Sequence, residues 1–214
     1  MMRTVSTENA AAPPARSLTR KGQATRDRIV AIAAGLMFER GVAGTSIEDV
    51  QKAAEISPSQ IYHYFADKRS LVRAVIGYQT EYVLGTQEPL LSRLDSIEAL
   101  LAWRDYMVAI QRRYHCAGGC PIGSLANELA DQDPQARAEL AAGFARWETA
   151  IRDGLHAMRD RGELHQDADP EFLALATLTA LEGGLLMTKT RRDTLALEAV
   201  LDAMIDRIRC HATR

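Results

Sequence analysis

The sequence predicts an all-α protein in which a small N-terminal unit of three helices precedes a larger helical body. Three observations predict this fold class. Every strongly periodic segment repeats its apolar residues at intervals of three and four, which is the spacing of a helix face. Ser, Thr and Asp residues stand where these segments begin, and Gly41 and Gly162 stand where two of them end. The composition, 47% hydrophobic and 25% charged over 214 residues, is sufficient to build a core.

The N-terminal part of the chain is expected to hold an arm and three helices. Residues 1–20 contain no continuous apolar run, so they are expected to form a disordered arm rather than a secretory signal. Helices are expected over about 25–40, from Thr45 or Ser46 to 55, and from Ser57 to 66, with Pro58 at a first helical position. Two short helices joined by a tight turn have the form of a helix-turn-helix. Residues 21–67 are therefore predicted to be one domain and residues 68–214 another.

The second domain is expected to be entirely helical and to form a dimer. Helices are expected from about residue 68, over 96–114, over 134–161, from Asp169, and over 193–210, with a glycine-rich break at 116–123. The helix that opens at Asp169 is apolar nearly all round, so two of its faces must be covered. Pairing the last two helices with their symmetry mates in a two-fold dimer covers both. Gly183 and Gly184 would allow close approach in that interface.

The net charge of -2 conceals two regions of opposite sign. Residues 16–75 hold ten Lys or Arg against six Asp or Glu, whereas the 139 residues that follow hold 15 against 21. The basic N-terminal region suits a polyanionic partner. No window approaches the roughly 18 to 20 apolar residues that span a bilayer, and an odd number of cysteines, three, fits a reducing compartment. The protein is therefore expected in the cytoplasm and not in a membrane.

Polar side chains gather on the second helix of the predicted pair. Hydroxyl, amide, phenol and imidazole groups follow its N-terminus, where such groups reach phosphates and base edges. The run from Thr45 to Leu71, with Ile-Tyr-His-Tyr-Phe at 61–65 and Lys68 behind it, resembles the DNA-binding signature of TetR-type transcriptional repressors. The likeness extends over about residues 22–76. The turn position at which that family commonly has glycine is Glu55 here.

This resemblance implies a set of DNA contacts and a mode of assembly. Helix N-termini and the recognition helix would present Thr25, Thr45, Ser57, Ser59, Gln60, Tyr62, His63, Tyr64 and Lys68 to operator DNA. Arg16, Arg20 and Lys21 in the arm would add backbone or groove contacts. TetR-type regulators usually form dimers through their last two helices, and two recognition helices then reach successive major grooves roughly 34 to 36 Å apart.

The body is expected to bind a small aromatic or hydrophobic inducer that releases the operator by moving the helix from residue 68. Its aromatic and flexible side chains, with two polar groups, would line the cavity: Trp103, Tyr106, Met107, Ile110, Asn127, Phe144, Trp147, Phe172 and Glu182. The alternative for most of these side chains is plain core. Residues 119–130 and 181–185 resemble the LmrA/YxaF-like branch of TetR repressors, whose members control efflux or detoxification genes.

Two other functions are weighed against an inducible repressor. Cys116 and Cys120 flank a Gly-Gly turn close to Arg112 and His115, and such neighbours lower a thiol pKa, which favours a redox-responsive or electrophile-responsive repressor. The second is a helical module whose N-terminal unit binds a protein. Zinc is not expected, because His115 and the two cysteines supply only three ligands at unsuitable spacing. No phosphate-binding loop, GxSxG or HExxH motif is present, so neither an enzyme nor a cofactor is expected.

Overall fold

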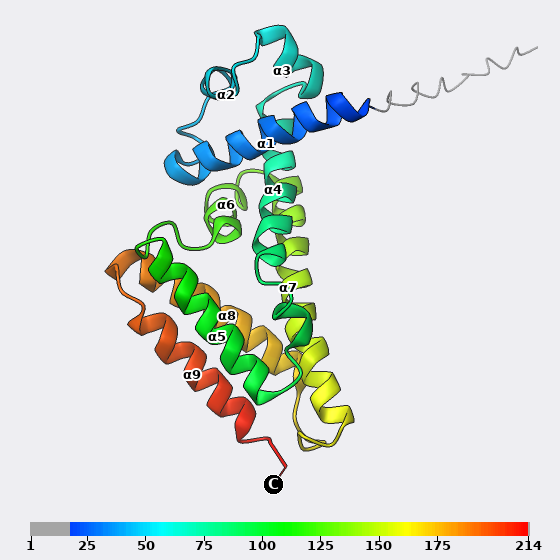
Figure 1. Cartoon of the computed structure of the whole chain (residues 1–214), viewed down its shortest axis with the longest axis vertical. Coiled ribbons are helices and arrows are strands. Elements are labelled where there is room, and N and C mark those ends of the chain that lie inside the picture. Colours follow the sequence, from blue (N-terminus) through cyan, green and yellow to red (C-terminus); the bar gives the residue numbers. More distant parts are fainter. Residues whose placement is uncertain (1–17, 214) are drawn as a thin grey trace, which may run out of the picture.

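The computed structural model of the chain describes residues 18–213 (Figure 1). Over these residues the chain is helical, and its one pairing of extended segments is an isolated bridge between Leu164 and Ala212. The all-α prediction is therefore confirmed. The helices are α1 (Arg20–Arg40), α2 (Ile47–Ala54), α3 (Pro58–Tyr64), α4 (Lys68–Gly85), the 3-10 turn η1 (Leu91–Arg93), α5 (Ile97–Arg113), α6 (Pro121–Leu129), α7 (Pro134–Asp160), α8 (Pro170–Arg191) and α9 (Leu195–Arg209).

Helices α1 to α3 form a small unit, called the head below, at the end of the molecule opposite the C-terminus (Figure 1). The first helix begins five residues earlier than the sequence predicts, because the Thr19 hydroxyl caps it by accepting from Gly22 N at 3.2 Å. Its first two turns are polar, so the apolar pattern that starts at Ile29 does not reveal them. The predicted arm lies outside the described residues except for its last three, and Arg20 already belongs to α1.

Helices α2 and α3 form the predicted helix-turn-helix. Ser46 caps α2 in a capping box with Asp49, and Ser57 caps α3 in a second box with Gln60. Glu55 occupies the turn in the left-handed conformation, at φ 51° and ψ 47°. A residue with a Cβ there carries a conformational cost that glycine avoids, of roughly 1 kcal/mol. The turn is thus formed without glycine, and buried Ile61 then packs α3 onto the core of the head.

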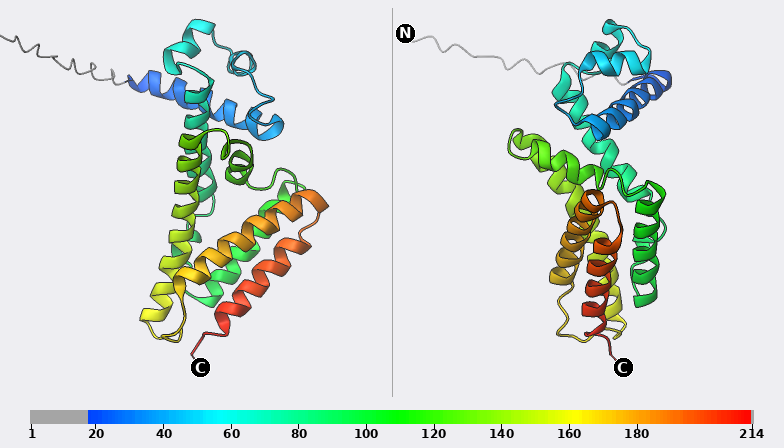
Figure 2. Two further views of the ribbon diagram at one scale, coloured as in Figure 1. Left: turned by 180° about the vertical axis from the view of Figure 1, so that it is seen from behind. Right: turned by 90° about the vertical axis from the view of Figure 1, so that its left-hand side faces the viewer.

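Helix α4 joins the head to the remaining helices, α5 to α9, which are called the body below. It packs against α1 in the head and against α7 in the body (Figure 1). Helices α8 and α9 pack together, α5 covers α9, and α8 also packs on α7 (Figure 2). Among the described helices, α8 alone is long and apolar enough to cross a membrane, and 44% of that apolar window is buried inside the protein.

Helix α6 was not predicted, because the sequence shows a glycine-rich break where it begins. Cys120 caps it weakly, with its sulfur accepting from Gly123 N at 3.4 Å, and Pro121 occupies the first turn. Only Ile122 and Leu125 of its nine residues are buried, which is too few for a helical period to stand out. The helix packs against both α4 and α7, on the side of the body nearest the head (Figure 1).

Candidate nucleic-acid interface and ligand site

The outward side of α3 carries the polar groups expected of a recognition helix. Ser59, Gln60, Tyr62 and His63 are all exposed, and half of the Tyr62 side chain, 52%, is open to solvent. Ser57 and Gln60 are partly engaged by the capping box, since Gln60 Oε1 accepts from Ser57 N at 2.9 Å. The amide nitrogen of Gln60 is left to donate outward. This side of α3 can therefore offer hydroxyl, amide and phenol groups to a groove at once.

Tyr64 belongs to both the surface and the core. It is half-buried against the hydrophobic core, and the His63 ring meets it edge to face with centroids 4.9 Å apart. Tyr64 therefore supports the position of His63 as well as presenting its own edge.

Two of the expected DNA contacts are corrected by the structure. Thr25 lies within α1, not at a helix N-terminus, and its hydroxyl donates to Lys21 O at 3.0 Å. Thr45 is fully buried and its hydroxyl donates to Gly41 O at 2.9 Å, while Ser46 is the residue that caps α2. Lys68 donates from Nζ to Val42 O at 2.6 Å, which ties it to the α1–α2 loop, and its contact with a phosphate stays a prediction.

Part of the positive charge of the head is used inside it. Arg28 donates to Ala54 O at 2.7 Å, and the Arg26 guanidinium lies over the Phe65 ring, 5.2 Å from its centroid. The exposed cations available to a phosphate backbone, for which no ion pair is described, include Arg20, Lys21, Lys52 and Arg69. Lys52 and Arg69 lie close in sequence to α3 and were not among the predicted contacts, because charge counting does not separate free cations from internally bound ones.

Sequence comparison places both parts of the chain in one family. The profile of bacterial regulatory proteins of the tetR family matches residues 29–75, and that of the tetracyclin repressor-like C-terminal domain matches residues 96–204. The chain belongs to the TetR family. TetR-family regulators bind operator DNA, act as dimers and respond to small-molecule ligands, so this chain is a DNA-binding transcriptional regulator and not an enzyme.

Transcriptional regulators are similar to this chain over nearly their whole length, which agrees with the TetR assignment. An HTH-type transcriptional regulator of Mycobacterium tuberculosis is 31% identical over 190 residues, covering 83% of this chain and 91% of that protein. The HTH-type transcriptional repressor DhaR of a Mycobacterium species is 24% identical over 183 residues, 85% and 90% of the two chains. A TetR regulator from Chloroflexus aurantiacus superposes with a TM-score of 0.77 at 29% identity, covering 91% and 98%.

The residues expected to line a ligand cavity lie in different surroundings, from the core to the surface. Trp103 and Trp147 are fully buried in the core, and Trp103 Nε1 donates to Gln87 Oε1 at 2.8 Å. Met107 is buried, Phe144 packs on the core, Asn127 is exposed, and 59% of Phe172 is open to solvent on α8. Two hollows are described, one between α1, α4 and α6 and one open depression beside Arg112, and neither is lined by any of the nine residues.

Glu182 occupies a buried position beside the start of α6. Burial raises the pKa of its carboxyl, while a hydrogen bond with the Cys120 thiol opposes that rise. Its Oε1 is buried without a hydrogen-bond partner among the described residues. Compared with water, the site therefore stabilises the neutral acid relative to the carboxylate. Of the two predicted polar residues, Glu182 is the one that the structure places inside the body.

The premise of a reactive thiol is wrong for Cys120. Burial and the neighbouring Glu182 hold the pKa of this thiol well above its ordinary value, which is the opposite of the expected effect of cations. Arg112 is not free to act on it, because its guanidinium pairs with Glu198 at 2.8 Å. Cys116 is also buried. Across residues 18–213 no cluster of His, Cys, Asp and Glu has the form of a metal site.

Four tyrosines form one cluster: two on α4, one on α5 and one just after the end of α5. Of these, only Tyr106 was among the predicted ligand residues. Tyr78 and Tyr82 on α4 stack with their planes 10° apart and their centroids 6.3 Å apart. A hydrogen bond with Tyr114, with weaker effects of Tyr78 and Tyr106, raises the pKa of Tyr82. Tyr106 donates to Thr86 O at the end of α4. Between 37% and 54% of Tyr78, Tyr82 and Tyr114 is exposed, so the cluster offers aromatic surface to a ligand.

Proposed function

We propose that the protein is a repressor that binds a near-palindromic operator as a homodimer and leaves it when a small aromatic or hydrophobic molecule binds the body. The observation that carries the proposal is the capped α3 helix, whose exposed side presents Ser59, Gln60, Tyr62 and His63 to solvent, with their described contacts confined to neighbouring residues 57–64. A regulator that acts on chromosomal DNA works in the cytoplasm. Repression agrees with the name of the relative DhaR, which is called a repressor.

The exposed face of α8 supports a dimer through the last two helices. Phe172, Leu175 and Leu186 follow one another along this face with 59%, 53% and 63% of their surface open to solvent. Contiguous apolar surface of this kind marks an interface. Gly183 lies on the same face with open space around it, as close helix approach requires. Gly184 has a different role from the expected one, because it lets Leu197 and Val200 of α9 pack against α8 within the subunit.

The tyrosine cluster supports an aromatic inducer. Its rings project from α4, the helix that carries the head, and from α5, so a ligand held between them would act directly on the position of α4. Such a ligand shifts operator binding only as far as its affinity differs between the two positions. The LmrA/YxaF-like assignment and the control of efflux or detoxification genes stay predictions.

Footprinting of the DNA next to the protein's own gene tests the repressor proposal. Protection is expected on a near-palindrome whose half-sites lie one helical turn apart. With three or four exposed cations in each head, log Kd is expected to change with log salt with a slope of about 6. A DNA fragment of shuffled sequence is the control. Equal affinity for the shuffled fragment would exclude sequence-specific operator binding. Binding to a protein partner and not to DNA would favour the interaction-module alternative.

Replacing Tyr82 by leucine (Tyr82→Leu) is expected to weaken the inducer response without changing operator affinity. The substitution removes one stacked ring and the phenol that meets Tyr114, worth about 1 to 1.5 kcal/mol. The concentration of an aromatic compound that releases half of the operator should therefore rise about tenfold. Tyr82→Phe keeps the ring, so its release midpoint should lie between those of the parent and Tyr82→Leu. Release curves are measured by fluorescence anisotropy of labelled operator, and an unchanged midpoint for Tyr82→Leu would exclude the cluster as the inducer site.

A further inference from the structure

The loop between α1 and α2 is held from two sides. Glu128 at the end of α6 accepts from Val42 N at 2.8 Å and Ala43 N at 3.4 Å through the same carboxylate oxygen. On the other side, Lys68 at the start of α4 donates to Val42 O at 2.6 Å. The peptide groups of Val42 are thus bound at once to the body through α6 and to the connecting helix through α4. Hydrogen bonds to a charged acceptor are about twice as strong as neutral ones.

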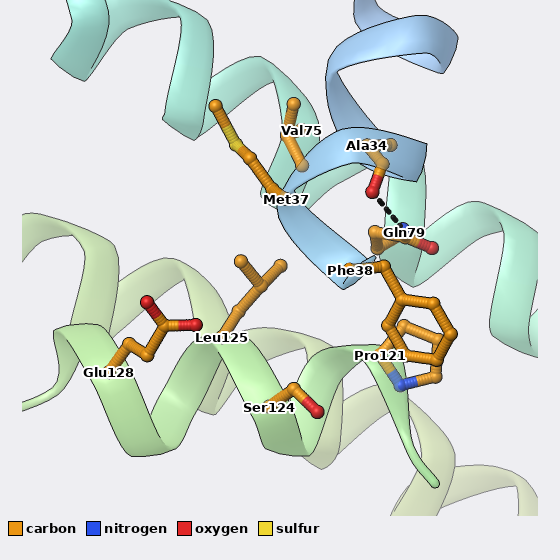
Figure 3. Close-up of a pocket in the computed structure, with 9 residues that line it drawn as sticks. All are labelled: Ala34, Met37, Phe38, Val75, Gln79, Pro121, Ser124, Leu125 and Glu128. Atoms are coloured by element: carbon orange, nitrogen blue, oxygen red, sulfur yellow. Dashed lines mark hydrogen bonds between the residues drawn. The ribbon is translucent and has the colours of Figure 1, made fainter. Parts of the chain in front are cut away.

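A second contact fixes the other end of α6 against the head. The ring of Phe38, near the end of α1, lies against Gly118 in the turn that precedes α6. Gly118 has φ +89°, and a Cβ at that position would overlap the Phe38 ring. Pro121 lies beside the same ring in Figure 3. Two contacts at opposite ends of α6 fix the direction of α1 relative to the body, whereas a single contact would leave it free to pivot.

Between these two contacts lies a small hollow bordered by α1, α4 and α6 (Figure 3). Gln79 reaches into it from α4, and its only described hydrogen bond is a long one, from Nε2 to Ala34 O at 3.5 Å. The space that a water molecule could occupy is about 10 Å³, far below the roughly 300 to 1,000 Å³ of a typical ligand site. Met37, Val75 and Leu125 pack around it, so apolar contacts hold the three helices together while the Glu128 hydrogen bonds direct the loop.

Two ion pairs also join α4 to the body. Arg73 on α4 pairs with Glu139 on α7 at 2.9 Å, and Glu81 on α4 pairs with Arg146 on α7 at 2.5 Å. Between 33% and 68% of these four side chains is exposed. Exposed pairs of this kind contribute little, because solvent screens them and their long side chains lose freedom. The carboxylate of Glu128 differs in that it binds backbone amides, which are fixed in direction by the fold of the loop.

We propose that Glu128 is the positioning residue that sets the angle of the head on the body. Because its carboxylate binds the α1–α2 loop, the position of α6 determines the position of that loop. Helix α3 lies beyond the loop, at the far end of the head (Figure 1). A small rotation at the joint is magnified at α3. In the dimer of the proposed function, on which the consequence for DNA rests, the two Glu128 contacts would define the separation of the recognition helices.

Distances between spin labels within one chain test the proposal without DNA. Cys210 is the exposed cysteine and is replaced by serine, and labels are attached at Ala53→Cys in the head and Ala142→Cys in the body, both exposed positions. Labelled chains are diluted with unlabelled chains so that only the distance within a chain is read. Glu128→Ala is expected to widen the distance distribution about twofold. Glu128→Gln keeps an accepting oxygen, so its distance distribution should be close to that of the parent.

Asp131→Ala is the matched control, because it removes one exposed carboxylate from the loop just after α6 where no hydrogen bond or ion pair is described. It should leave the distribution unchanged. An equally narrow distribution for Glu128→Ala, at the same mean distance, overturns the proposal. This result does not depend on operator or dimer, so it is distinguishable from failure of the proposed function.

Operator spacing provides the functional readout. Once the protected site is known, Kd is measured on that site and on a variant with one base pair inserted between the half-sites. Loss of the charged acceptor should reduce the discrimination between the two sites about tenfold in Glu128→Ala, with Glu128→Gln restoring most of it. Equal discrimination in Glu128→Ala and the parent, with equal thermal unfolding, counts against the positioning role.

Discussion

Replacing Leu186 by aspartate (Leu186→Asp) is expected to convert the dimer to monomers and to weaken operator binding by at least about 100-fold. Leu186 lies at the C-terminal end of the exposed apolar face of α8 and is its most exposed member, with 63% of its surface open. In a two-fold interface the substitution buries a carboxylate without a partner in each subunit. The second head then no longer binds as part of the same molecule, and such linkage is typically worth about 10² to 10⁴ in affinity.

Sedimentation velocity and operator titration on the same samples measure this effect. Leu101→Asp is the matched control, because Leu101 is also an exposed leucine, 37% open, but lies on α5 outside that face of α8. It should remain dimeric with parental affinity. Both variants should keep the parental thermal unfolding of an isolated subunit at low concentration, since neither side chain is in the core. A Leu186→Asp protein that stays dimeric would place the interface elsewhere.

The helices that the sequence predicts well are those with caps and a full apolar stripe. Asp169 caps α8 as expected, Asp133 caps α7, and each helix begins with a proline. The sequence fails where a helix has little apolar surface of its own. Helix α6 buries only Ile122 and Leu125, and the first turns of α1 are polar, so periodicity could not show them. Their positions depend on tertiary contacts and on caps that a pattern does not weigh.

The candidate DNA site was predicted best where side chains have nothing to bind within the chain. Tyr62 and His63 remain exposed, as expected. Thr45 and Lys68 instead bind backbone carbonyl groups of the α1–α2 loop, contacts that only the folded arrangement creates. A residue's type shows which bonds it can form, but not whether a nearby carbonyl already forms them.

The ligand site shows the same limit more strongly. Aromatic residues at helical spacing are usually core, and this is the outcome for Trp103 and Trp147. The exposed cluster arises where Tyr78 and Tyr82 on one helix meet Tyr106 on another and Tyr114 just beyond its end. This meeting depends on how α4 and α5 are placed, which no local pattern contains.

Removing the Tyr62 ring (Tyr62→Ala) is expected to weaken operator binding about 100-fold. The side chain is half exposed on the outward side of α3 and makes no described hydrogen bond, so its loss should not affect folding. A base-edge or sugar contact is worth about 1 to 2 kcal/mol in each head. Both heads lose it together, which gives about 2 to 4 kcal/mol for the dimer, and each 1.4 kcal/mol is about tenfold. Tyr62→Phe separates the ring from the hydroxyl.

Arg69→Ala is the matched comparison that assigns the kind of contact. Arg69 is an exposed cation at the start of α4, suited to a phosphate and not to a base. Its removal should lower affinity for operator and shuffled DNA alike and reduce the salt slope by about 0.9 for each head. Tyr62→Ala should leave the salt slope unchanged and lower affinity for operator alone. If Tyr62→Ala weakens binding to both DNAs equally, Tyr62 contacts the backbone, and sequence reading must come from Ser59, Gln60 and His63 instead.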